Sequence, residues 1–137
     1  GVRLVGSEMC IRDRHKKIME FKKTKNKNGK LKVFDKLKKF STKRVFLIEM
    51  NKKDVRGNHG HKKHNQILLL FSGKIEITYF DIKKDNAEKK TILSEGEIFE
   101  MYENIHIKFI ALKKSLIVVL ANKHFNKKDY FTRLNVT

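Results

Sequence analysis

The sequence predicts an all-β protein, an antiparallel barrel or jelly roll that forms a single domain. Seven short segments rich in β-branched and aromatic residues follow one another along the chain, with short polar or glycine-containing turns between them. No internal repeat or long linker interrupts the pattern, and roughly 120 residues are enough for one hydrophobic core. These observations favour a closed or two-layered antiparallel sheet.

The predicted strands can be placed by their composition. Within 74–82, Ile75, Ile77 and Tyr79 take every second position, which is typical of a half-buried strand. Residues 83–90 are expected to form a hairpin loop, and 124–134 one helical turn. The strands are expected at 45–50, 66–71, 74–82, 90–95, 97–102, 106–112 and 116–122.

The first residues do not resemble a natural N-terminus. Residues 3–14, RLVGSEMCIRDR, match one reading frame of a transposase mosaic-end sequencing adapter. We therefore expect residues 1–14 to be a translated adapter artefact, and the native domain to occupy 15–137. Setting the adapter aside removes Cys10, the only cysteine, and with it any disulfide or thiolate metal site.

The strong positive charge does not indicate a nucleic-acid partner. The formal net charge is +18, but the lysines are scattered as pairs and no aromatic-interleaved basic strip accompanies them. Many Asn and Ile residues suggest instead an AT-rich genome. The longest apolar runs, 67–71 and 116–121, have the length of strands rather than of membrane spans. We expect a soluble, cytoplasmic protein with no membrane partner.

The residues best suited to catalysis or ligand binding lie in one stretch, 56–75. It reads RGNHGHKKHNQILLLFSGKI and places His59 and His61 two apart, ahead of an apolar run. Residues two apart on a strand point to the same face, so both imidazoles are expected to converge on one small volume. This spacing predicts a functional site mounted on a strand.

The spacing alone leaves the kind of site open. His59, His61, Gln66 and Gly73 have the spacing of the first cupin motif, and 96–106 resembles the second. Three histidines, with His106 as the third, could hold a divalent metal. However, Gln66 stands where metal-binding cupins usually carry Glu, and it supplies no charge to offset a cation. The alternatives are a metal-dependent enzyme, a metal-free site and ordinary surface histidines.

A family resemblance narrows these alternatives. Segments 43–48, 56–77 and 116–131 resemble the WxcM-like sugar 3,4-ketoisomerase family, and the RGxHxHK core is its most specific part. The resemblance covers roughly residues 20–133 and implies a cupin-type jelly-roll barrel that works without a metal or other cofactor. It also implies a homodimer that converts dTDP-4-keto-6-deoxyglucose to a 3-keto-6-deoxyhexose in deoxyamino-sugar biosynthesis for surface polysaccharides. A non-catalytic sugar-nucleotide-binding cupin remains a further alternative.

The resemblance assigns roles to three residues of the core motif. His59 is the expected base that removes the C3 proton, and His61 is its partner or a second proton carrier, because imidazoles titrate near neutrality. Arg56 is expected to bind the diphosphate or to steady the site electrostatically. Gly60 replaces the Ala of the family pattern, which we expect to have no obvious cost.

The sequence is less informative about three further candidate site residues. Gln66 is expected either to hydrogen-bond to substrate in the pocket or to orient a histidine. On a regular strand the parity of His64 opposes that of the two motif histidines, so we expect it to be exposed. His106 is a candidate for substrate binding, with a satisfied barrel histidine as the alternative.

One departure from the family concerns the proton donor. Family members carry tyrosines where this chain has Phe46 and Leu47, and one of those tyrosines has an acid role near the sugar. The corresponding hydroxyl is therefore missing. Tyr79 and Tyr102 are the candidates to replace it, and Tyr102 is included among the expected substrate-binding residues.

Overall fold

The structure, a computed structural model, describes residues 18–20, 22–34, 40–84 and 87–132. The expected adapter segment, 1–14, lies outside the described residues. Strands are the main element among the described residues; turns and loops join them, and one short 3-10 helix precedes the last strand. The strands are β1 (Ile18–Glu20), β2 (Lys22–Asn26), β3 (Gly29–Val33), β4 (Arg44–Met50), β5 (Val55–His61), β6 (Gln66–Asp81), β7 (Lys89–Ser94), β8 (Glu97–Met101), β9 (Ile105–Ala121) and β10 (Tyr130–Phe131), and the 3-10 helix is η2 (Lys127–Asp129).

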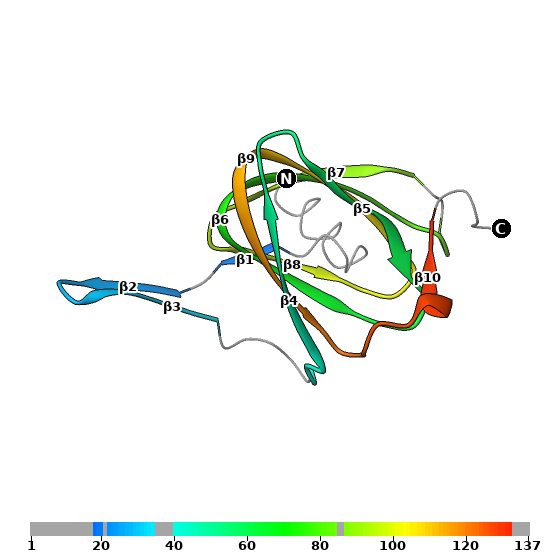
Figure 1. Ribbon diagram of the computed structural model, residues 1–137, viewed down its shortest axis with the longest axis horizontal. Helices are drawn as coiled ribbons and strands as arrows, with labels where there is room; N and C mark the ends of the chain where they lie inside the picture. Colours follow the sequence, from blue (N-terminus) through cyan, green and yellow to red (C-terminus); the bar gives the residue numbers. More distant parts are fainter. Residues whose placement is uncertain (1–17, 21, 35–39, 85–86, 133–137) are drawn as a thin grey trace, which may run out of the picture.

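Two long strands organise the barrel. β6 and β9 pair with each other along almost their whole length, and Figure 1 shows both curving around the interior. The first half of β6 also pairs with β8 and its second half with β7, whereas β9 pairs with β5 at its start and with β4 at its end. All pairs are antiparallel. The predicted all-β, cupin-type jelly-roll barrel in a single domain is confirmed.

Each long strand was expected to be two strands separated by a turn, and this expectation was wrong. β6 passes through Ser72 and Gly73, and β9 through 113–115, with register shifts rather than reversals. Gly73 has φ +100°, and a Cβ there would lie 2.1 Å from Ser115 Oγ and 2.5 Å from the Lys114 carbonyl oxygen. The glycine therefore allows bulges that bend the two strands around the barrel without interrupting them.

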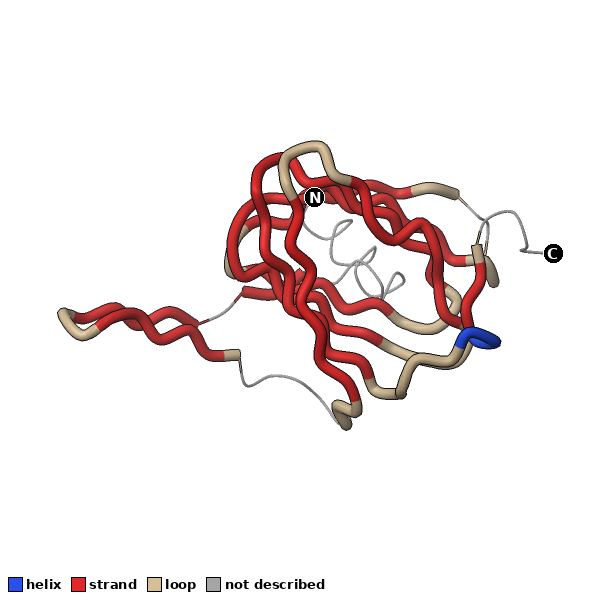
Figure 2. Tube along the Cα trace, viewed as in Figure 1, coloured by secondary structure: helices blue, strands red, loops and turns tan. Residues whose placement is uncertain are grey.

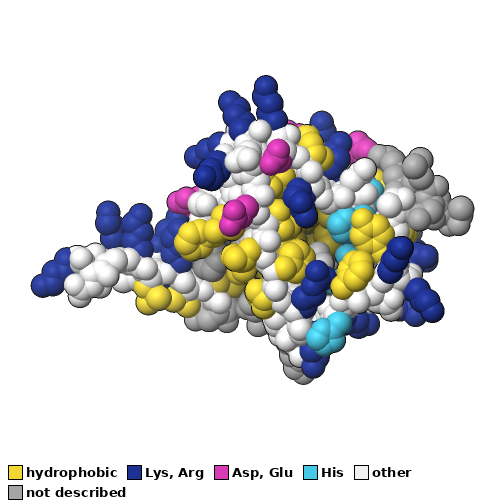
Figure 3. Space-filling view, in the orientation of Figure 1, with side chains coloured by type: hydrophobic (Ala, Val, Ile, Leu, Met, Phe, Trp, Pro, Cys, Tyr) yellow, Lys and Arg dark blue, Asp and Glu magenta, His cyan; other side chains and the backbone are white. Residues whose placement is uncertain are grey.

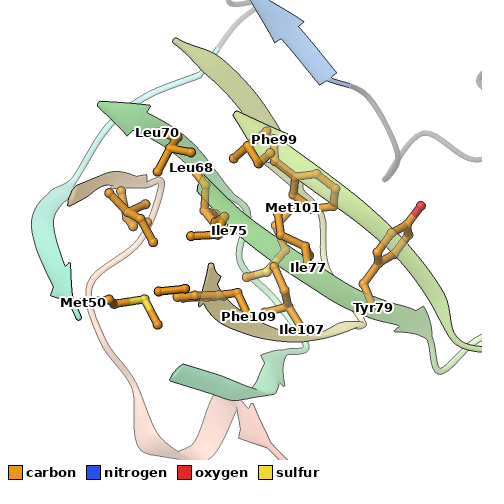
Figure 4. Packing of buried hydrophobic residues seen from close by; sticks show 14 of the residues in the cluster. Met50, Leu68, Leu70, Ile75, Ile77, Tyr79, Phe99, Met101, Ile107 and Phe109 are labelled. Carbon is orange, nitrogen blue, oxygen red and sulfur yellow. The ribbon is translucent and has the colours of Figure 1, made fainter. Parts of the chain in front are cut away.

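The core lies between the two layers of strands. Ile75, Ile77 and Tyr79 are buried as their alternation predicts. In Figure 4, side chains from β6, β8 and β9, among them Leu68, Met101 and Ile107, point into one interior. Burial of this apolar surface is the main stabilising contribution to the barrel.

A lysine-rich hairpin was not expected from the sequence. β2 and β3 pair with each other in a separate two-stranded sheet, which projects away from the barrel in Figure 2. The residues of β2 are all exposed, so no apolar alternation marks the strand. The expected helical turn near the C-terminus is confirmed as η2, capped by Asn126, whose side chain accepts a hydrogen bond from the Lys128 amide (3.0 Å). None of the described residues belongs to a helix with the length and apolarity needed to cross a bilayer.

Candidate active site

A cavity of about 190 Å³ opens among strands β4, β5, β6, β8, β9 and β10. One side of it, which we call the apolar floor, is made of hydrophobic side chains from the barrel interior. The other lining residues include two arginines and two histidines, and Figure 3 shows histidine beside hydrophobic side chains on one face of the molecule. The apolar floor consists of Ile48, Leu68, Met101, Ile107, Phe109 and Val119.

The structure brings His59 and His61 together on β5. Both line the cavity, and their ring centroids are 5.3 Å apart with the rings almost perpendicular (89°). The strand is irregular just before them: Gly57 and Asn58 both have positive φ, and the pairing with β9 shifts between Gly57 and His59. The bulge re-aims the histidine pair toward the cavity, as bulges beside functional sites commonly do.

Tyr130 lines the cavity next to these histidines. β10 pairs with β5, so that Tyr130 lies opposite His61, and its ring stacks on His59 with centroids 4.4 Å apart and planes 18° from parallel. Tyr130 was not predicted from the sequence to be a site residue. The available signal was its position in the 116–131 segment that carries part of the family resemblance.

The expectation that His64 is exposed was wrong. Its side chain is 1% exposed, and its ring stacks on His61 with a centroid separation of 3.9 Å. Residues 62–65 form the connection between β5 and β6, so the alternation of the strand does not continue to this position. The side chain folds back against the histidine pair instead of pointing to solvent.

His64 takes part in a hydrogen-bonded network with Asp129 and Gln66. Its Nδ1 donates to Asp129 Oδ2 (3.0 Å), and its Nε2 accepts from Gln66 Nε2 (3.2 Å), which assigns the neutral tautomer with the proton on Nδ1. Asp129 is held in turn by the Lys63 amide, which donates to its Oδ1 (2.6 Å). Gln66 thus both lines the cavity and orients a histidine. We call His59, His61, His64, Asp129 and Tyr130 the histidine wall.

The electrostatic environment keeps the imidazoles neutral. Burial lowers the pKa of His61 to about 4, and the positive fields of His64 and His59 act in the same direction, while Asp129, 3.6 Å from His61 Nδ1, opposes them. Burial likewise lowers the pKa of His59, and that of His64 against the opposing effect of Asp129. All three rings are therefore unprotonated near neutral pH.

The charged groups that line the cavity are both cationic. Arg44 and Arg56 lie on its rim, and none of the described lining residues is an aspartate or glutamate. The Arg44 guanidinium lies over the Phe46 ring (4.5 Å to the centroid) and near the Phe125 ring (5.6 Å). Both aromatic rings lie within cation–π distance of this guanidinium, and the cavity as a whole favours an anionic ligand.

Three side chains of the histidine wall have distances compatible with metal binding. The ligand atoms of His61, His64 and Asp129 lie within 4.8 Å of one another, and a tetrahedral zinc ion would place its donors about 3.4 Å apart. The ring planes of the two histidines are only 28° from parallel, however, and an imidazole nitrogen directs its lone pair within the ring plane. The lone pairs do not converge on one point, so the arrangement fits a hydrogen-bonded network better than a metal centre.

Two expected substrate-binding residues lie outside the cavity. His106 is buried and stacks on Phe80 (centroids 4.6 Å apart, planes 15° from parallel), away from the lining residues. The Tyr102 hydroxyl donates to Glu100 Oε2. Arg56 and Gln66, by contrast, line the cavity together with His59 and His61.

Comparisons with known proteins agree with this geometry. The model of the family described as "FdtA: WxcM-like, C-terminal" matches residues 14–135, and no curated protein matches the chain. A 3,4-ketoisomerase from Helicobacter canadensis is 27% identical with a TM-score of 0.75, covering 87% of this chain and 91% of its own. WlaRA, a TDP-fucose-3,4-ketoisomerase from Campylobacter jejuni, is 26% identical (TM-score 0.71, coverage 86% and 89%). QdtA, a sugar 3,4-ketoisomerase from Thermoanaerobacterium thermosaccharolyticum solved in complex with TDP, is 25% identical (TM-score 0.72, coverage 84% and 85%).

Proposed function

Because the chain belongs to the FdtA, WxcM-like C-terminal family, we propose that it is a sugar-nucleotide isomerase that converts dTDP-4-keto-6-deoxyglucose to a dTDP-3-keto-6-deoxyhexose. The observation that carries the proposal is a pair of neutral imidazoles, His59 and His61, in a cavity whose charged lining groups are both arginines. The solved 3,4-ketoisomerases similar to this chain support the reaction class.

The histidine pair suits the carbon acid chemistry of this reaction. Moving a carbonyl from C4 to C3 requires removal of the C3 proton, passage through an enediolate and reprotonation at C4. His59 is the proposed base, and burial keeps it unprotonated and ready to accept. If His61 receives a proton instead, Asp129 lies 3.6 Å from its Nδ1 and stabilises the resulting charge.

The two arginines suit the nucleotide. A diphosphate linkage carries two negative charges, and guanidinium groups bind such oxyanions with paired hydrogen bonds. Arg44, from β4, and Arg56, from β5, both line the cavity, and no carboxylate among the described lining residues competes for them. The TDP complex of QdtA supports a thymidine diphosphate group as the anchor of the substrate.

The proposed reaction needs no cofactor. C3 is oxidised and C4 reduced within one molecule, and both changes are achieved by proton transfers. The keto product is a substrate for a transaminating enzyme, which would yield a 3-amino-3,6-dideoxyhexose for surface polysaccharides. We further propose that the protein acts as a homodimer; the exposed apolar residues Val45 and Leu47 on the outer face of β4 support such a contact.

Incubation with dTDP-4-keto-6-deoxyglucose in deuterated water tests the function directly. Deuterium should appear at C3 of the recovered substrate and at C4 of the 3-keto product that accumulates, both measured by NMR. His59→Ala should abolish both, whereas His124→Gln, which alters an exposed histidine outside the cavity, should leave them unchanged. Absence of exchange and of product in the unaltered protein would refute the proposal, and loss of activity on chelator treatment would favour a metal-dependent enzyme instead.

A further inference from the structure

The proposed isomerisation moves two protons, and the histidines account for only one of them. The hydrogen on C3 is transferred to C4, while the hydroxyl proton on O3 must be lost and O4 must gain one. A group with a dissociable O–H beside the substrate oxygens performs the second transfer most directly. In this chain Phe46 removes the hydroxyl expected from the family resemblance.

The structure leaves one hydroxyl in the cavity. The chain has three tyrosines: Tyr79 is packed in the core against Phe99 (centroids 5.4 Å apart), and the Tyr102 hydroxyl donates to Glu100. Neither lines the cavity, whereas Tyr130 does. The described lining residues include no serine, threonine, cysteine, lysine, aspartate or glutamate. Tyr130 is therefore the only side chain among them with an O–H group.

Tyr130 is also held firmly in place. Its backbone pairs with β5 opposite His61, and the next residue, Phe131, is 1% exposed and anchors β10 in the interior. The preceding residue, Asp129, accepts hydrogen bonds at its backbone carbonyl from the Lys62 amide (3.0 Å) and at its side chain from the Lys63 amide (2.6 Å). Stacking of the Tyr130 ring on His59 then fixes its orientation relative to the proposed base. A preorganised acid beside the base is the arrangement that enolisation requires.

We propose that Tyr130 is the catalytic acid and base for the substrate oxygens, an assignment that rests on the proposed function. As His59 removes the C3 proton, the Tyr130 phenol donates its proton to O4, and the C3–C4 enediol forms. The Tyr130 phenolate then takes the proton from O3 while the histidine returns its proton to C4. The C3 carbonyl has formed, the C4 carbonyl has become a secondary alcohol, and both side chains regain their starting protonation.

Two substitutions separate this role from simple support of His59. Tyr130→Phe retains the ring that stacks on His59 and removes only the hydroxyl, whereas Tyr130→Leu removes both. We expect Tyr130→Phe to lower kcat roughly 100-fold, the range typical of a lost general acid, with KM changed less than about threefold. Thermal unfolding of Tyr130→Phe should match that of the unaltered protein. Activity within about threefold of the unaltered protein would overturn the assignment.

A third variant changes the kcat–pH profile only if the Tyr130 hydroxyl transfers a proton, and not if the ring merely supports His59. Incorporating 3,5-difluorotyrosine at position 130 makes the phenol more acidic without altering the ring stack. The alkaline limb of the kcat–pH profile should then move to lower pH, because the proton donor is lost earlier. An unchanged profile would overturn the assignment even if Tyr130→Phe is impaired. These outcomes are distinct from failure of the proposed function, in which the unaltered protein itself shows no turnover.

Discussion

The apolar floor and three residues of the histidine wall, His59, His61 and Tyr130, line the same cavity, but floor and wall are built differently. The floor is contributed mainly by β6, β8 and β9, whose regular pairing continues over many residues. The wall depends on β5, interrupted by a bulge, on the two residues of β10 and on a connection that belongs to no strand. Its geometry is fixed by a few hydrogen bonds and ring stacks rather than by a continuous ladder.

Because of this difference, we expect the floor residues to contribute mainly to the stability of the fold and the wall residues mainly to the chemistry of the site. Floor residues are among the core cluster, so each is held by many neighbours and contributes mostly through burial. Wall residues are polar, buried or half-buried, and mutually dependent, since loss of one partner leaves another polar atom without its hydrogen bond. Changes in the floor should therefore reduce the free energy of unfolding most, and changes in the wall should act through specific contacts.

The largest effect is expected from a cavity in the floor. Leu68 is 2% exposed in the core, and Leu68→Ala should lower the free energy of unfolding by about 2–5 kcal/mol, measured by urea denaturation. Leu69, the next residue of β6, faces the other side and is half-buried. Leu69→Ala is the matched control and should cost clearly less. Equal losses would contradict the division between the interior face and the outer face of β6.

The second-largest loss of stability is expected at Gly60, where β10 packs closely against β5. A Cβ at Gly60 would lie 2.3 Å from the Ile105 carbonyl oxygen and 2.4 Å from the Phe131 ring. Glycine is therefore required at this position, because the close packing of β9 and β10 against β5 leaves no space for a methyl group, and the alanine of the family pattern would not fit here. Gly60→Ala should cost about 1–3 kcal/mol of unfolding free energy in urea denaturation.

The control for this substitution is a glycine outside the barrel. Gly29, in the β2–β3 hairpin, has φ +130°, whereas Gly60 is not among the glycines with positive φ, and a Cβ at Gly29 would meet no atom within 4 Å. Gly29→Ala therefore adds backbone strain without a steric clash and should cost about 1–2 kcal/mol. If Gly60→Ala, which adds only the steric clash, has no measurable cost, the close contact between β5 and Phe131 does not hold in solution.

A smaller effect is expected from the charge in the histidine wall. Asp129→Asn preserves shape but removes the carboxylate that accepts from His64 Nδ1 and from the Lys63 amide. A loss of about 1.5 kcal/mol at pH 7 is expected, because hydrogen bonds to charged groups are the stronger ones. Asp54→Asn is the matched control: its carboxylate accepts from the Asn51 amide in an exposed turn, and its loss should cost much less. Similar losses for the two variants in urea denaturation would contradict the wall network.

The contrast between floor and wall also explains what the sequence could predict. The alternation of Ile75, Ile77 and Tyr79 reports directly on which face is buried, so the barrel and its core followed from local pattern. The HxH spacing likewise brought His59 and His61 to one cavity. These patterns involve only residues that are close in the sequence, so they can be recognised without the tertiary structure.

The remaining parts of the site depend on pairings between distant segments. Tyr130 and Asp129 reach the histidines because β10 pairs with the edge of β5. A strand of two residues has no local sequence pattern from which that pairing could be predicted. His64 was wrongly expected to be exposed because the alternation of side chains along the strand was extended beyond the end of β5. The bulges at Gly73 and Ser115 were mistaken for turns, since a glycine required by a close approach resembles one required by a reversal.

The smallest effect concerns pH and His61. Its pKa is lowered to about 4 in the folded state, chiefly by burial, from an ordinary value near 6.5. Its neutral form therefore contributes stability that is fully present above pH 6.5 and is lost as the pH falls toward 4, where the folded protein must take up a proton against burial. Arg44, His59 and His64 face the ring and add to the loss, whereas Asp129 moderates it.

Thermal unfolding between pH 7 and pH 4.5 measures this contribution. His61→Gln should give a shallower fall in Tm over that interval than the unaltered protein, even if its Tm at pH 7 is lower. The slope should not vanish, because burial lowers the pKa of His59 and His64 as well. His124→Gln, at an exposed position, should leave the slope unchanged. Parallel curves for His61→Gln and the unaltered protein would mean that His61 protonates freely in the folded state, and the histidine wall would then be open to water rather than buried.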